Sequence, residues 1–222
     1  MTAYEIGAVD SNTSGARTGT GPLVDLLGPD DAPLLLRDLY AGGDPGPIVA
    51  ALAQVPELCQ ATLPFVGAAL GPSSVGIRLK EIAILRTSAL LGCRYCVDAH
   101  TVVAHDAAGF AGDQLCLLRA ETDDASSIDD PVEAAALSWV DAVAAGRGPV
   151  PIGVGADASR HLPDHHLVEL TTTVGATMFL NRFATALRLP TSADTLSRLS
   201  DLGLATWQPR PADSQPGPGS EA

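Results

Sequence analysis

The fold and the chemistry of this chain are decided by one short stretch, Gly92-Cys93-Arg94-Tyr95-Cys96-Val97-Asp98-Ala99-His100. The flanking residues have a helical pattern, so we place 93–108 on one helix at about 100° per residue. One face of that helix then carries both thiols and the imidazole, followed by Val103 and Ala107. The opposite face is expected to point to water, and it carries Arg94, Asp98, Thr101 and His105.

The start of this helix has a consequence for the two thiols. Gly92 ends the preceding apolar run, so Cys93 is expected at the N-cap and Cys96 in the first turn. Unpaired backbone N–H groups and the positive end of the helix dipole favour an anion there, so the thiol pKa should fall. His100, one turn beyond Cys96, can accept or return a proton. The stretch therefore predicts a redox-active dithiol with a base beside it.

Composition limits the classes of protein that the chain can belong to. Its 222 residues form one sizeable domain or two small ones, and 46% of them are apolar, which is enough for a core. The net charge of -13 argues against nucleic acid and against an anionic membrane surface as partners. The first residues lack the basic and apolar parts of a secretory signal, and no run approaches the roughly 20 apolar residues of a membrane span. We therefore expect a cytoplasmic protein.

The pattern along the chain predicts an all-α protein. Residues 1–21 read as a flexible N-terminal arm, 22–206 as the helical domain and 207–222 as a disordered C-terminal tail. The glycine- and proline-rich stretch from 146 to 162 reads as a loop. No stretch alternates as strands do, which counts against a thioredoxin-like fold. Helices are expected over 32–41, 47–54, 56–70, 75–91, 93–108, 111–120, 131–145, 164–188 and 191–203.

The motif and its surroundings resemble a known family. Glu81 precedes Cys93 by twelve positions, and a Cys-x-x-Cys-x-x-x-His pattern follows. Residues 79–82, 93–101, 133–137 and 168–183 match in kind, so the resemblance covers about 45 to 190. On these residues the chain resembles the alkylhydroperoxidase D-like, or carboxymuconolactone decarboxylase, superfamily. The resemblance implies a compact multi-helix bundle, homo-oligomers and no bound cofactor.

The resemblance also implies roles for four residues. In peroxidase members the second cysteine is oxidised by a hydroperoxide to a sulfenic acid, and the first resolves it as a disulfide that an external dithiol reduces. By motif position, Cys96 is the peroxidatic thiol and Cys93 the resolving thiol, while Glu81 and His100 relay protons. The chain departs from some members at Tyr95, where they have a second histidine.

The leading hypothesis is a cofactor-free, thiol-dependent peroxidase or oxidoreductase. Decarboxylase members lack the dithiol, yet a member recruited to metabolism as a decarboxylase, isomerase or carbon–carbon lyase stays open. A non-catalytic, redox-sensing oligomer is the third hypothesis.

Each site residue also has a purely structural interpretation. The cysteine pair could be core packing or half of a zinc site, although zinc needs four ligands and only His105 and Cys116 are near in sequence. His100 could be a core histidine, and Glu81 could form a surface ion pair with Arg78. Cys59 reads as an inert core residue, as does Cys116. Asn181 and Arg182 could line a pocket or a subunit interface, or be a buried amide and an ion pair.

Overall fold

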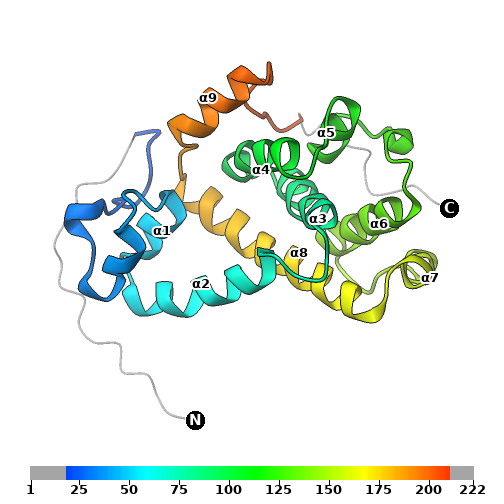
Figure 1. Ribbon diagram of the computed structural model, residues 1–222, viewed down its shortest axis with the longest axis horizontal. Helices are drawn as coiled ribbons and strands as arrows, with labels where there is room; N and C mark the ends of the chain where they lie inside the picture. The colour runs from blue at the N-terminus through cyan, green and yellow to red at the C-terminus, as the bar shows by residue number, and fades with distance from the viewer. Residues whose placement is uncertain (1–18, 211–222) are drawn as a thin grey trace, which may run out of the picture.

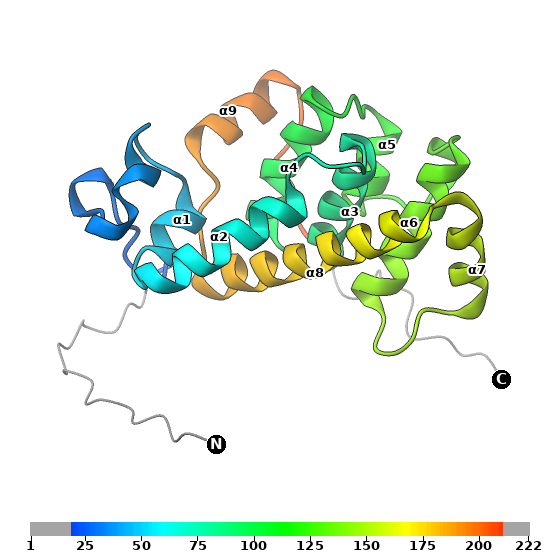
Figure 2. The same ribbon diagram turned by 60° about the horizontal axis from the view of Figure 1, so that its bottom comes forward.

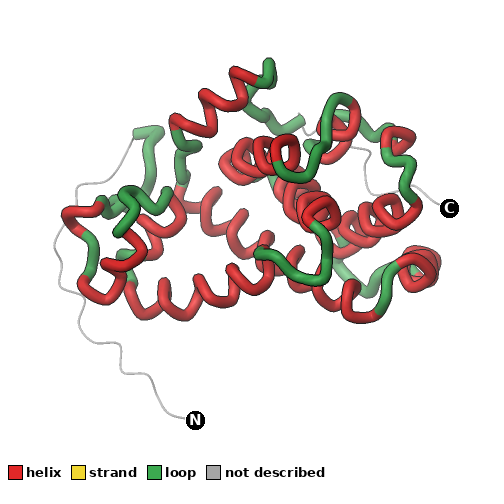
Figure 3. Tube along the Cα trace, viewed as in Figure 1, coloured by secondary structure: helices red, strands yellow, loops and turns green. Residues whose placement is uncertain are grey.

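The part of the chain that the structure describes consists of helices joined by loops and turns. The structure is a computed structural model that describes residues 19–210, and no strand occurs in that range (Figure 3). The predicted all-α fold is therefore confirmed. The predicted arm and tail fall largely outside the described residues, and the boundaries 1–21, 22–206 and 207–222 stay predictions.

The other α-helices pack around a central helix over Ile77–Leu90 (Figure 1). Short 3-10 helices cover Pro29–Asp31, Leu34–Tyr40 and Ala125–Ser127. No helix in residues 19–210 has both the length and the apolar character needed to cross a bilayer. The α-helices are α1 (Pro47–Leu52), α2 (Pro56–Leu70), α3 (Ile77–Leu90), α4 (Arg94–Asp106), α5 (Asp113–Leu118), α6 (Pro131–Ala145), α7 (Ile152–His161), α8 (Asp164–Leu187) and α9 (Ala193–Asp201).

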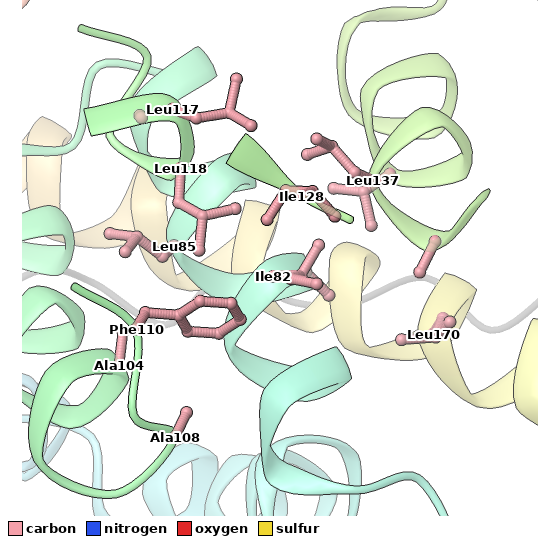
Figure 4. Close-up of a cluster of buried hydrophobic side chains, with 14 of the residues drawn as sticks. Ile82, Leu85, Ala104, Ala108, Phe110, Leu117, Leu118, Ile128, Leu137 and Leu170 are labelled. Carbon is pink, nitrogen blue, oxygen red and sulfur yellow. The ribbon is translucent and has the colours of Figure 1, made fainter. Parts of the chain in front are cut away.

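The core forms where α3 meets its neighbours. Helix α3 packs against α4, α6 and α8, and the long α8 runs along one side of the molecule (Figure 2). The side chains of Ile82, Leu85, Phe110 and Leu170 are fully buried in the main apolar cluster (Figure 4). A smaller cluster contains Cys93 and Cys96 together with residues of α1 and α8. The two thiols therefore lie inside the protein, on the side away from the main core.

Helix α3 also carries the single lysine of the chain, and that lysine is buried. Lys80 is 1% exposed, and its Nζ lies 2.7 Å from Oε1 of Glu169 on α8. The same Nζ donates to the backbone oxygen of Ala69 on α2, at 2.6 Å. A buried ammonium must be paired and hydrogen-bonded to be tolerated. Lys80 thus joins α2, α3 and α8 at the position directly before Glu81.

The stretch from 146 to 162, predicted as a loop, contains helix α7. The loop was predicted because Gly153 and Gly155 lower the helix propensity of the segment, and the prediction was wrong. The helix is supported by packing, since Ala158 and Leu162 are buried in the main cluster, and α7 lies against α6. Burial of one side of a short helix outweighs a propensity cost of about 1 kcal/mol for each glycine.

The water-facing side predicted for α4 is only partly correct: Arg94 is exposed and His105 is half-buried, but the other two residues are not exposed. Asp98 and Thr101 are fully buried, whereas Ala107, expected inside, is exposed. The reason lies late in the chain: Asp98 accepts the backbone N–H of Trp207 at 2.8 Å and the hydroxyl of Thr191 at 3.0 Å. The segments on both sides of α9 therefore cover the face that sequence periodicity assigned to water (Figure 1).

Candidate active site

A tight turn between α3 and α4 sets the position of the first thiol. Gly92 has φ 71°, a left-handed conformation that favours glycine. Its N–H bonds the oxygen of Ala89, and the N–H of Cys93 bonds the oxygen of Ser88, which is the Schellman pattern of a helix C-terminus. Cys93 then serves as the N-cap of α4, as predicted, with Cys96 in the first turn. Both cysteines are nearly inaccessible, at 1% and 5% exposure.

Cys96 lines a small cavity, here called the Cys96 cavity, of about 80 Å³. His100 and Tyr95 line it from α4, while Ser88 comes from α3 and Asn181 from α8. The rest of the wall is mostly apolar, formed by Ile48, Leu70, Ile84, Ala99 and Leu180. Cys96 and His100, predicted on one face of α4, thus line the same cavity.

A buried carboxylate holds the imidazole. Nδ1 of His100 lies 3.0 Å from Oε2 of Glu81, whose residue is only 2% exposed. Since the carboxylate accepts a hydrogen bond, Nδ1 carries the proton and Nε2 is left as the acceptor. Arg78, the alternative partner of Glu81, instead pairs with Glu133 on α6 at 2.5 Å. The surface ion pair considered for Glu81 therefore does not form.

The two sulfurs share one hydrogen bond, which shifts their pKa values in opposite directions. The bond from the Cys96 thiol lowers the pKa of Cys93 to about 7, against the opposing effect of burial. The same bond, with burial and the nearby Cys93 charge, raises the pKa of Cys96 above its ordinary value. The expected fall in thiol pKa thus applies to Cys93 and is wrong for Cys96. These two directions favour ionisation of Cys93 over ionisation of Cys96.

Three polar residues complete the cavity, and sequence reasoning gave little weight to them. The Nδ2 of Asn181 donates to the hydroxyl of Ser88 at 3.0 Å, and Asn181 also lowers the pKa of both thiols by hydrogen bonding. The Oδ1 of Asn181 and the hydroxyl of Thr177 are buried without a hydrogen-bond partner in the described protein. The available signal was helical spacing, because Ser88 follows Glu81 by seven positions and Thr177 precedes Asn181 by four.

The remaining residues considered from the sequence lie apart from this cavity. Arg182 is exposed on α8, one position from Asn181 but on another side of the helix. Cys59 is fully buried in a separate apolar cluster, and Cys116 is only half-buried. Within residues 19–210 no three or more His, Cys, Asp or Glu side chains gather as metal ligands would.

Comparison with known proteins agrees with this architecture. The sequence profile of the Carboxymuconolactone decarboxylase family matches residues 56–142, which contain Glu81 and the dithiol motif. A comparison with curated protein sequences gives no match. A solved protein of unknown function from Agrobacterium tumefaciens, described as a candidate antioxidant defence protein AhpD, is 26% identical with a TM-score of 0.57. That match covers 64% of this chain and 95% of the other.

Two more distant structures share the fold. An uncharacterized peroxidase-related protein from Silicibacter is 16% identical with a TM-score of 0.68, covering 78% of this chain and 93% of its own. The debrominase Bmp8 is 19% identical with a TM-score of 0.65, covering 83% of this chain and 100% of its own. These likenesses concern the arrangement of helices and assign no substrate.

The family profile and the structural neighbours indicate the same class, an AhpD-like helical protein. The family-profile match over residues 56–142 and the structural neighbours support the AhpD-like/carboxymuconolactone decarboxylase superfamily. This similarity supports a peroxidase-related or carboxymuconolactone decarboxylase-type function at the level of the family.

Proposed function

We propose that this protein is a cofactor-free thiol peroxidase that reduces small hydroperoxides. The observation that carries the proposal is the Cys96 cavity, in which a thiol and an imidazole meet beside a buried carboxylate. Glu81 holds Nδ1 of His100, so Nε2 is the basic nitrogen. A base oriented by a third group is the arrangement that activates nucleophiles in many enzymes.

The first step is the attack of Cys96 on the peroxide. The Cys96 proton passes to Nε2 of His100, directly or through a water in the cavity, and the resulting imidazolium is stabilised by Glu81. The thiolate sulfur bonds to the outer oxygen of the hydroperoxide, and the O–O bond breaks. The leaving alkoxide takes the proton from His100 and departs as an alcohol. Cys96 is left as a sulfenic acid.

The second step closes the disulfide. Cys93, whose pKa is lowered to about 7, is available as a thiolate near neutral pH. Its sulfur attacks the Cys96 sulfur, and the hydroxide that leaves takes a proton and departs as water. One hydroperoxide and two thiols thus give one alcohol, one water and one disulfide. A thiol reductant from outside the protein then restores the reduced pair.

The dimensions of the cavity limit the substrate. About 80 Å³ with mostly apolar walls accommodates hydrogen peroxide or a short alkyl hydroperoxide. The unpartnered Asn181 Oδ1 and Thr177 hydroxyl are placed to accept or donate a hydrogen bond to the peroxide group. We therefore expect the rate to fall as the alkyl group becomes bulkier.

The test is stopped-flow measurement of hydroperoxide consumption by the pre-reduced protein. Cys96→Ser should abolish the rapid reaction. Cys93→Ser should retain one turnover and stop at the sulfenic acid, which a dimedone reagent traps. Cys59→Ser is the matched control, because Cys59 is buried but does not line the Cys96 cavity, and it should react like the parent.

Different results would favour the other hypotheses. If Cys96→Ser reacts as fast as the parent, the assignment of Cys96 is wrong. Turnover of a carbon substrate that survives loss of Cys93 would instead indicate a lyase, decarboxylase or isomerase. A protein that forms the disulfide but shows no catalytic turnover with any dithiol tested would be a redox sensor.

A further inference from the structure

The two thiols face different hollows of the protein. Cys96 lines the cavity described above, whereas Cys93 lines a second hollow of about 170 Å³. That hollow adjoins a larger one of about 430 Å³, because Arg94, Tyr95, Arg188 and Leu189 line both. We call these two spaces together the arginine hollow. Tyr95 also lines the Cys96 cavity, so its half-buried ring stands between the two sides.

The arginine hollow carries positive charge with little compensation. No Asp or Glu is found among its described lining residues. Arg188 bonds only the backbone oxygen of Gly19, at 3.0 Å, among the contacts found within residues 19–210. The carboxylate nearest to Arg94 is that of Asp98, at 3.7 Å, and its oxygens already accept Trp207 and Thr191.

Arg37, Arg147 and Arg182 also have no carboxylate contact among the described residues, but they line neither hollow. Six arginines of the described region each contact a carboxylate at 2.9 Å or less, namely Arg78, Arg86, Arg119, Arg160, Arg198 and Arg210. The protein as a whole has a net charge of -13. One hollow of this acidic protein is thus lined by two guanidinium groups, Arg188 with no carboxylate contact among the described residues and Arg94 at 3.7 Å from Asp98, and such a pair suits an anion.

We propose that the arginine hollow binds the reductant of the disulfide, and that this reductant is a small thiol carrying an anionic group. The inference rests on the proposed function, which supplies the Cys93–Cys96 disulfide. Arg94 and Arg188 bind the carboxylate or sulfonate of the thiol, and its sulfur is then directed at Cys93. Peroxide and reductant thus reach the dithiol from opposite sides of Tyr95.

The reduction is balanced as two thiol–disulfide exchanges. The thiolate of the first reductant molecule attacks the Cys93 sulfur, the Cys93–Cys96 bond breaks, and Cys96 leaves and takes a proton from His100. A second reductant thiolate attacks the reductant sulfur of the mixed disulfide, and Cys93 leaves as a thiolate. Two thiols are oxidised to one disulfide, and the protein regains its dithiol. Cys93 suits the last role, since a thiol of low pKa leaves readily.

The test measures this half-reaction alone. The protein is oxidised with diamide, and its reduction is followed with three thiols of similar size: mercaptoethanesulfonate, mercaptoethanol and cysteamine, which are anionic, neutral and cationic. Rates are expressed per thiolate. The parent should prefer the anionic thiol, and Arg188→Glu should lower the anionic-to-neutral rate ratio by about tenfold. Arg94→Gln should lower this rate ratio by a smaller factor. This variant replaces Arg188→Glu in the test if Arg188→Glu does not fold.

The matched control is Arg182→Glu, which makes the same change of charge on α8 at a residue that lines neither hollow. Its rate ratio should stay within about twofold of the parent. Equal ratios in Arg188→Glu and Arg182→Glu would overturn the inference and leave the proposed peroxidase function standing. If diamide forms no Cys93–Cys96 disulfide, both proposals fail together.

Discussion

The two sides of the dithiol lie close together but differ in volume, in wall composition and in charge. On the Cys96 side apolar residues form much of the wall together with a few uncharged polar ones, the space is about 80 Å³, and a buried carboxylate holds the imidazole. On the Cys93 side the hollow is several times larger and lined by guanidinium groups. The difference shows how one short motif can serve two partners. A neutral peroxide fits the first side, and a charged reductant fits the second.

The largest effect that would test this division is expected at Glu81. In Glu81→Gln the amide can still bond His100, but it lacks the charge that stabilises the imidazolium. We expect the second-order rate with hydrogen peroxide, measured by stopped flow, to fall by about 100-fold. Disulfide reduction at the arginine hollow should be much less affected.

Glu133→Gln is the control for this prediction. It removes another buried carboxylate of an ion pair, with Arg78, at a distance from the cavity. Its peroxide rate should stay near that of the parent. Equal losses in the two variants would mean that Glu81 acts only through stability.

The next effect concerns the charge shared by the two sulfurs. The ultraviolet absorbance of thiolate should appear in the reduced parent with a midpoint near pH 7, the lowered pKa of Cys93. In Cys96→Ala the donor of the hydrogen bond is gone, so the midpoint should rise toward the ordinary value of 9.0. Cys59→Ala should leave the midpoint at its position in the parent.

The lowered pKa of Cys93 also predicts how the stability of the fold depends on pH. Since the pKa of Cys93 is lower in the folded protein, the Cys93 thiolate stabilises the fold fully above the ordinary pKa of 9.0. This stabilisation decreases as the pH falls and is lost below pH 7. If the thiolate absorbance of the parent had its midpoint near pH 9, Cys93 would not be the thiolate of the reduced protein.

A smaller effect should follow from enlarging the Cys96 cavity. Ile84→Ala removes side-chain volume from its wall, so a bulky hydroperoxide such as cumene hydroperoxide should gain about tenfold relative to hydrogen peroxide. Ile82→Ala, also buried on α3 but in the main core, should lose a similar amount of stability without changing that ratio. An unchanged ratio in Ile84→Ala would place the peroxide outside this cavity.

The smallest effect is expected at Tyr95, between the two sides. Burial raises the pKa of its phenol to about 12, so the group stays neutral during the reaction. Tyr95→Phe keeps the ring, and we expect both half-reactions to remain within about threefold of the parent. Loss of the peroxide reaction alone would show instead that the phenol takes part in the proton relay.

Sequence periodicity was sufficient for most of the fold and for part of the site. Gly92 and the helical spacing placed Cys93 at an N-cap and His100 one turn from Cys96, because those relations lie within a few residues. The buried side of α4 could not be predicted, since Asp98 is covered by Thr191 and Trp207, about a hundred positions later. Helix α7 was missed because its stability comes from packing on α6 rather than from its own residues.

The polar residues of the site divide in the same manner. Glu81 was found only through family spacing, since its partner His100 lies on another helix. Asn181 gave no signal by itself, because an amide in a long helix has many uses. Its role became visible when α8 placed it beside Ser88 and both sulfurs.

The burial of Lys80 makes the protein easy to follow by chemical labelling. Apart from the amine at the start of the chain, no other primary amine exists in the 222 residues. An amine-reactive dye therefore cannot modify a lysine while α2, α3 and α8 stay together. Labelling at Lys80 would report opening of that junction at α3, the helix that also carries Glu81, and would time such openings without an introduced probe.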